Sequence, residues 1–71
     1  MKQRITLRDM EYIIAKGTTV DLIRYDEDLN IVDQFFGPYP IPGARMGYEV
    51  VSLYVFKDRD TGEPYLRINC R

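Results

Sequence analysis

The chain has 71 residues, with ten Lys or Arg against eleven Asp or Glu, one cysteine and no histidine. This near balance of charge excludes nucleic-acid binding that depends on a strongly basic surface, and it equally excludes an acidic mimic of DNA. The lack of histidine and of a second cysteine excludes the common zinc sites, a Ser-His or Cys-His catalytic pair and an internal disulfide. No apolar run approaches the length that crosses a membrane, so we expect a cytoplasmic protein with no membrane partner. Residues 1–71 are expected to form a single small domain.

The first predicted element is a helix over residues 7–16. Thr6 is a good N-cap residue, and Asp9 stands three residues later, as in a capping box. Apolar side chains then recur at spacings of three and four residues: Leu7, Met10, Ile13 and Ile14. Gly17 follows as the residue that ends the helix. A helix of this length is marginal alone, so it is expected to pack against the rest of the chain.

The remainder of the chain predicts two β-hairpins. Alternating apolar and β-branched residues indicate four strands: residues 18–25, 31–36, 48–57 and 64–70. Acidic turn clusters at residues 26–30 and 58–62 would close the two hairpins. Between the hairpins, residues 37–47 contain three glycines and three prolines and are expected to be an extended connection rather than a strand.

These elements predict an α+β fold of order αββββ. The N-terminal helix would pack on one face of a four-stranded, mostly antiparallel sheet made of the two hairpins. The expected core residues on that face are Val20, Leu22, Val51, Leu53, Val55, Leu66 and Ile68. Because one short helix can cover only one face, the other face of the sheet should be left without a cover.

The uncovered face is the predicted functional surface. It is expected to present Tyr48, Val50, Tyr54, Phe56, Tyr65 and Arg67, and Tyr39 of the connection is a further candidate partner-binding residue. Tyrosine and arginine contribute much of the binding energy of protein interfaces. The face would therefore bind a protein partner or a second copy of the chain in a homodimer. The alternative is that these aromatic residues are ordinary cross-strand pairs, or that the connection folds back over them.

Two other functions are weaker candidates. Stacking of bases on Tyr54, Phe56 and Tyr65, with Arg67 on phosphate, would make the chain a small nucleic-acid-associated regulator. Its cations lie mostly beside acids, so we do not expect nucleic acid to be the partner. A structural subunit of an assembly is the other alternative.

Nothing in the sequence predicts an enzyme, a cofactor or a metal. The carboxylates cluster in the turns, where water keeps them ionised, and not in a cleft that would shift their pKa values. Residues 26–30 have the first ligand spacings of a calcium loop, but Ile31 stands where such a loop needs glycine and Gly37 where it needs glutamate. The simpler interpretation of this segment is a hairpin turn.

The order of these pieces resembles that of short accessory proteins of phages and mobile elements of Gram-positive bacteria. The matching pieces are a capped opening segment at residues 6–10, a Thr-Val-Asp-Leu strand at 19–22, a Gly/Pro stretch at 37–42 and a Glu-Val-Val strand at 49–51. Some small phage proteins are inhibitors of host defence, anti-CRISPR proteins among them, and act by binding and blocking. The resemblance therefore implies an inhibitor that binds a host defence or regulatory protein. It does not identify any functional residues in this chain.

Overall fold

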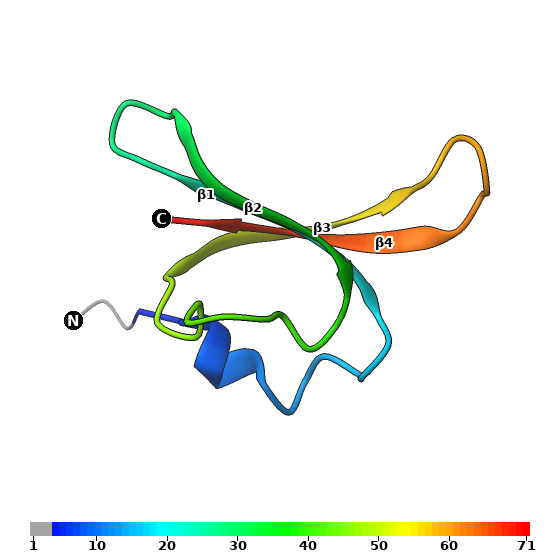
Figure 1. The fold of residues 1–71 in the computed structure, drawn as a ribbon, viewed down its shortest axis with the longest axis horizontal. Coiled ribbons are helices and arrows are strands. Elements are labelled where there is room, and N and C mark those ends of the chain that lie inside the picture. The colour runs from blue at the N-terminus through cyan, green and yellow to red at the C-terminus, as the bar shows by residue number, and fades with distance from the viewer. Residues whose placement is uncertain (1–3) are drawn as a thin grey trace.

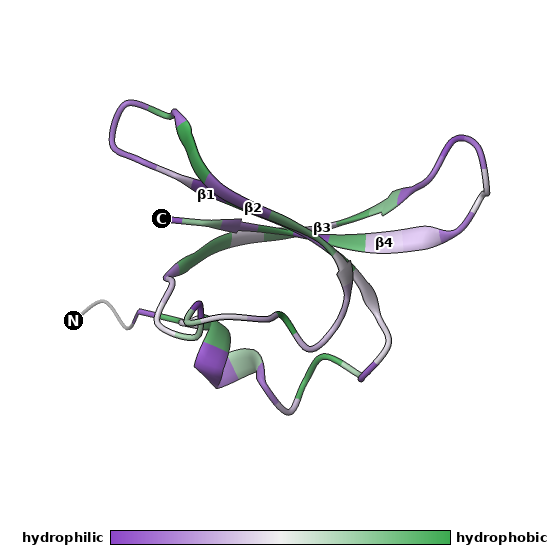
Figure 2. Cartoon of the chain, viewed as in Figure 1, coloured by the Kyte–Doolittle hydropathy of each residue, from purple (hydrophilic) through white to green (hydrophobic). Residues whose placement is uncertain are grey.

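The computed structural model describes residues 4–71, which form a curved four-stranded sheet above one layer of turn and loop (Figure 1). A single 3-10 turn and four strands follow in chain order: η1 (Leu7–Met10), β1 (Thr19–Tyr25), β2 (Ile31–Pro38), β3 (Val50–Lys57) and β4 (Pro64–Cys70). The strands lie in the order β2-β1-β4-β3, so β2 and β3 form the two edges of the sheet. The hairpin tips are mainly hydrophilic, whereas the strands carry much of the hydrophobic sequence (Figure 2).

Both predicted hairpins are confirmed. β1 and β2 pair antiparallel, with Leu22 opposite Phe35, and β3 and β4 pair antiparallel, with Leu53 opposite Ile68. The two hairpins join through β1 and β4, which run parallel and place Leu22 beside Ile68. The sheet is therefore mixed, and one long connection carries the chain from the edge strand β2 to the other edge strand, β3.

The predicted helix over residues 7–16 is wrong, and with it the α+β class, because the fold is nearly all-β. The capping interaction does form, since the backbone N–H of Thr6 donates to Asp9 Oδ2 at 2.8 Å, but regular structure ends after the single turn η1. The next residues include Tyr12, Ile13 and Ile14, and aromatic and β-branched side chains lose rotamer freedom in a helix. So short a helix also gains little from its own hydrogen bonds.

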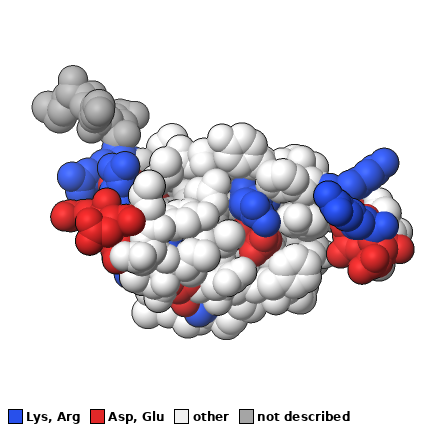
Figure 3. Space-filling model, turned by 90° about the horizontal axis from the view of Figure 1, so that it is seen from above, with Lys and Arg blue, Asp and Glu red and all other residues white. Residues whose placement is uncertain are grey.

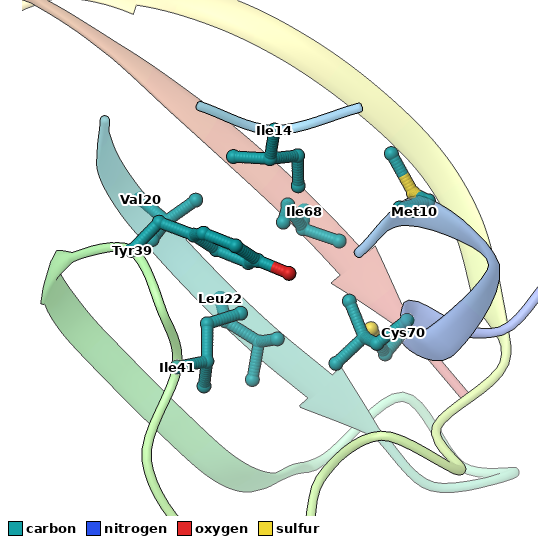
Figure 4. Packing of buried hydrophobic residues seen from close by; sticks show 9 residues of the cluster. Met10, Ile14, Val20, Leu22, Tyr39, Ile41, Ile68 and Cys70 are labelled. Atoms are coloured by element: carbon teal, nitrogen blue, oxygen red, sulfur yellow. The ribbon is translucent and has the colours of Figure 1, made fainter. Parts of the chain in front are cut away.

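The connection between β2 and β3 occupies the place on the core that the helix was expected to fill. Tyr39 and Ile41 of this connection are buried and pack against Val20 and Leu22 of β1 (Figure 4). The backbone ties the connection to the N-terminal segment, because Leu7 N donates to Tyr48 O and Arg8 N to Met46 O, both at 3.0 Å. The connection therefore covers the core face of the sheet and not the predicted partner face.

The predicted core is only partly correct. Val20, Leu22 and Ile68 are fully buried, and Leu66 is half-buried against them. Three other expected core residues are exposed: Val51, Leu53 and Val55. All three belong to the edge strand β3, which extends beyond the short cover that η1 and the connection provide.

Candidate functional site

The face of the sheet opposite the lower layer is open, because no other part of residues 4–71 lies over it (Figure 1). Figure 3 views the molecule from this side. Charged side chains gather at the two ends, one small group of both signs lies near the middle, and a few more charged atoms show along the lower edge. We call this surface the open face and define it by six residues of four strands: Asp21, Phe36, Tyr54, Phe56, Tyr65 and Arg67.

Four aromatic rings form a row across the open face. The rings of Tyr65 and Phe56, paired across β4 and β3, stack with centroids 5.7 Å apart, and Tyr54 continues the row 6.2 Å from Phe56. On the other side, the Phe36 ring of β2 meets the Tyr65 ring edge-on at 5.9 Å. These two rings meet although β1 lies between their strands. Thr19 of β1, which lies beside both rings, has a short side chain that leaves them room. Such contacts hold the rings in fixed orientations.

An ion pair lies beside this row, between Phe36 and Tyr54 in the strand register. Arg67 donates to Asp21 Oδ2 from Nη2 at 2.8 Å and from Nε at 3.1 Å, and its guanidinium carbon lies 4.7 Å from the centroid of the Phe56 ring. The hydrogen bond to Asp21 raises the pKa of Arg67. Asp21 is buried, and its other oxygen, Oδ1, has no hydrogen-bond partner within residues 4–71. The one cation on the open face is thus neutralised by an acid of the same face.

Four of the predicted partner-binding residues therefore lie together on the open face: Tyr54, Phe56, Tyr65 and Arg67. Two members of the open face were missed by the sequence analysis. Asp21 and Phe36 lie directly opposite each other in the pairing of β1 with β2. Their alternation was visible in the sequence, but their face follows only from the way the two hairpins join.

The structure places Tyr39, Tyr48 and Val50 away from the open face. Tyr39 is a core residue, and Val50 packs against the core opposite Cys70. The register of β3 shifts between Val50 and Ser52, so a β-bulge reverses the alternation that would have placed Val50 beside Tyr54. Tyr48 precedes the strand and packs against the edge of the core.

Tyr48 belongs to a second polar cluster, which fastens the connection to β2. Its hydroxyl donates to Asp33 Oδ2 at 2.8 Å, and Arg45 Nε donates to the same oxygen at 2.6 Å. Arg45 also donates to the carbonyl of Pro42, and Arg24 lies over the Tyr48 ring, 4.6 Å from its centroid. The bonds from Arg45 and then from Tyr48 hold the pKa of Asp33 well below its ordinary value. The carboxylate of Asp33 is saturated by these donors, so its role is structural.

The acidic turns are confirmed as hairpin turns. Asp26 Oδ1 accepts hydrogen bonds from the backbone N–H groups of Asn30 and Asp28, each at 2.9 Å, and Asp58 Oδ1 accepts from Asp60 and Thr61. These bonds lower the pKa of both carboxyl groups. Within residues 4–71, no three His, Cys, Asp or Glu side chains are grouped as a metal would require.

Comparisons with protein-family models, curated proteins and solved structures give no match to this chain. Among residues 4–71 there is no helix with the length and apolar character needed to span a membrane.

Proposed function

We propose that this chain is a non-enzymatic protein-binding module that contacts its partner through the open face. The observation that carries the proposal is the row of packed aromatic rings on a sheet face that nothing else in residues 4–71 covers. Phe36 and Tyr54 are 59% and 53% exposed although their ring orientations are held by neighbours. Aromatic side chains that are already ordered lose little entropy when a partner buries them.

The form of binding that we propose is inhibition in the cytoplasm. The resemblance to phage accessory proteins favours a chain that blocks a host defence or regulatory protein, as anti-CRISPR proteins do. The residues of the open face suit blocking and not chemistry, because its one acid and its one cation are bonded to each other. The partner would supply an apolar surface of several hundred Å², comparable to what three or four aromatic side chains can bury.

A protein partner is favoured over nucleic acid by the same ion pair. Binding of single strands needs aromatic stacking together with free cations that reach the phosphates. Arg67 is the cation of the open face, and Asp21 holds it at 2.8 Å. The other charged side chains visible in Figure 3 lie at the ends and along one edge of the molecule and are of both signs.

The test is affinity capture from a lysate of the cells that produce the chain, analysed by mass spectrometry. We expect one protein to be recovered by the wild type and to be insensitive to nuclease. The double variant Phe36→Ala, Tyr65→Ala should lose it, because loss of an interface anchor costs about 2 kcal/mol, roughly thirtyfold in affinity. The two changes lie in β2 and β4, so the edge strand β3 keeps its own sequence in this variant.

The matched control is Tyr12→Ala, since Tyr12 is 93% exposed and lies away from the open face. It should recover the partner as the wild type does, and thermal melting of each variant checks that the fold is retained. Recovery of the partner by the double variant would refute the open face as the contact surface. Recovery that nuclease abolishes would favour the nucleic-acid alternative instead.

A further inference from the structure

The outer edge of β3 is the least protected part of the sheet. Val50 N donates to Ile5 O at 2.7 Å, so the start of the strand is covered by the N-terminal segment. Beyond that point, no segment of residues 4–71 pairs with the outer edge of residues 51–57. Exposed apolar side chains project from this stretch on both faces of the sheet: Val51, Leu53, Tyr54, Val55 and Phe56.

The opposite edge strand shows how an edge is normally protected. β2 carries Asp33 near its middle and ends in Gly37 and Pro38, residues that discourage pairing with another strand. β3 contains neither glycine nor proline, and its single charge, Lys57, is its last residue. An unprotected apolar edge is a template for a further strand.

We propose that the outer edge of β3 pairs antiparallel with the same edge of a second copy, and that the chain forms a two-fold dimer with a continuous eight-stranded sheet. This dimer goes beyond the proposed function, because it uses the edge of the sheet, and of the open face it involves only Tyr54 and Phe56. A two-fold axis perpendicular to the sheet keeps both open faces on the same side. The aromatic rows of the two copies would then be continuous.

The free stretch also suggests the register. Residue 54 is the middle of residues 51–57, so a pairing that uses the whole stretch places Tyr54 opposite the Tyr54 of the second copy. Leu53 then lies opposite Val55 on the other face, an apolar pair that occurs twice. Each Lys57 lies opposite Val51 of the other copy. The two Lys57 positions are six residues apart along the pair, about 20 Å, so they do not repel each other strongly.

The size of the contact predicts its strength. Five partly exposed side chains offer roughly 100 Å² each, about 500 Å² per copy, which is less than the ~800 Å² of a standard interface. The hydrogen bonds between the two β3 strands fix the orientation of the two copies but add little net affinity. We therefore expect a reversible dimer whose population rises with protein concentration.

The first test is analytical ultracentrifugation from about 1 µM to about 500 µM protein, because a reversible dimer obeys mass action. The mass should rise from the monomer value of 8.4 kDa toward twice that value. Val55→Lys should weaken the dimer at least tenfold, since the two new ammonium groups would come within about 10 Å of each other. The matched control is Val32→Lys on the other edge strand. Val55 and Val32 are 74% and 52% exposed, so both variants should fold.

A second test does not depend on Val55→Lys. In a Cys70→Ser background, Tyr54→Cys should form an intermolecular disulfide under mild oxidation, because the register places the two thiols opposite each other. Val32→Cys in the same background should not. A wild type that stays monomeric at every concentration would overturn the proposal and leave this edge to a strand of a different protein. It would also be overturned if Val55→Lys dimerised like the wild type, or if Val32→Cys cross-linked in place of Tyr54→Cys.

Discussion

Replacing Tyr39 by phenylalanine should stabilise the protein. The Tyr39 side chain is only 6% exposed, and its hydroxyl is buried without a hydrogen-bond partner within residues 4–71. An unpaired buried hydroxyl costs roughly 1–3 kcal/mol, and phenylalanine keeps the ring while removing that cost. We expect the free energy of unfolding to rise by about 1 kcal/mol, which raises Tm by about 4–8 °C in a domain of this size.

Tyr39→Ala provides the opposite test at the same position. Removing a buried aromatic ring costs about 3–5 kcal/mol, as much as the whole stability expected of so small a domain. Thermal and urea unfolding followed by circular dichroism measure both changes. If Tyr39→Phe instead lowered the free energy of unfolding by about 1 kcal/mol or more, the Tyr39 hydroxyl would have a hydrogen-bond partner, such as an ordered water. If Tyr39→Ala melted like the parent, the connection would not cover the core.

Two further predictions concern titratable groups. The pKa of Asp33 is depressed by Arg45 and Tyr48, so its contribution to the free energy of unfolding is complete above about pH 5 and is lost as pH falls below about 4. Asp33→Asn should lower the free energy of unfolding at neutral pH and make it depend less on pH in the acid range, as urea titrations measure. If the pH dependence of the variant equalled that of the parent, Asp33 would not be its source. Burial raises the pKa of Cys70 to about 11, so a thiol reagent at neutral pH should modify it only after unfolding. Rapid modification of the native protein would show that the end of β4 opens.

The hairpins could be predicted because their information is local. Asp26 and Asp58 each use a carboxylate to bond backbone groups two to four residues ahead, so each turn is specified within five residues. The alternation in residues 64–70 likewise assigns Leu66, Ile68 and Cys70 to one face without reference to the rest of the chain.

The arrangement of the hairpins could not be predicted from such local signals. The parallel pairing that places Leu22 beside Ile68 joins residues 46 positions apart. Neither strand carries a local sequence signal that identifies the other as its neighbour. The helix prediction failed for a related reason. Three residues of the predicted stripe, Leu7, Met10 and Ile14, are buried, but Ile13 is 76% exposed. A turn followed by an irregular segment can make these three contacts with the core as well as a helix can.

In the candidate site, too, the features that depend on local sequence could be predicted and those that depend on long-range pairing could not. Tyr54, Phe56, Tyr65 and Arg67 alternate in two adjacent strands of one hairpin, so period and hairpin pairing were sufficient to bring them together. Val50 fits the same period but lies on the core side, because one extra residue at the bulge cannot be seen in an unbroken run of strand-forming residues.

The ion pair between Asp21 and Arg67 separates two explanations of the open face. If the face were only an outer surface, short polar side chains on the central strands would serve at less cost than a buried acid whose Oδ1 has no hydrogen-bond partner within residues 4–71. If the face binds a partner, the pair has a use, because it places charge beside an aromatic row that would otherwise bind any apolar surface. A partner that fits the rings must also tolerate the charges beside them. Selective binding through the proposed surface would account for the cost of burying Asp21.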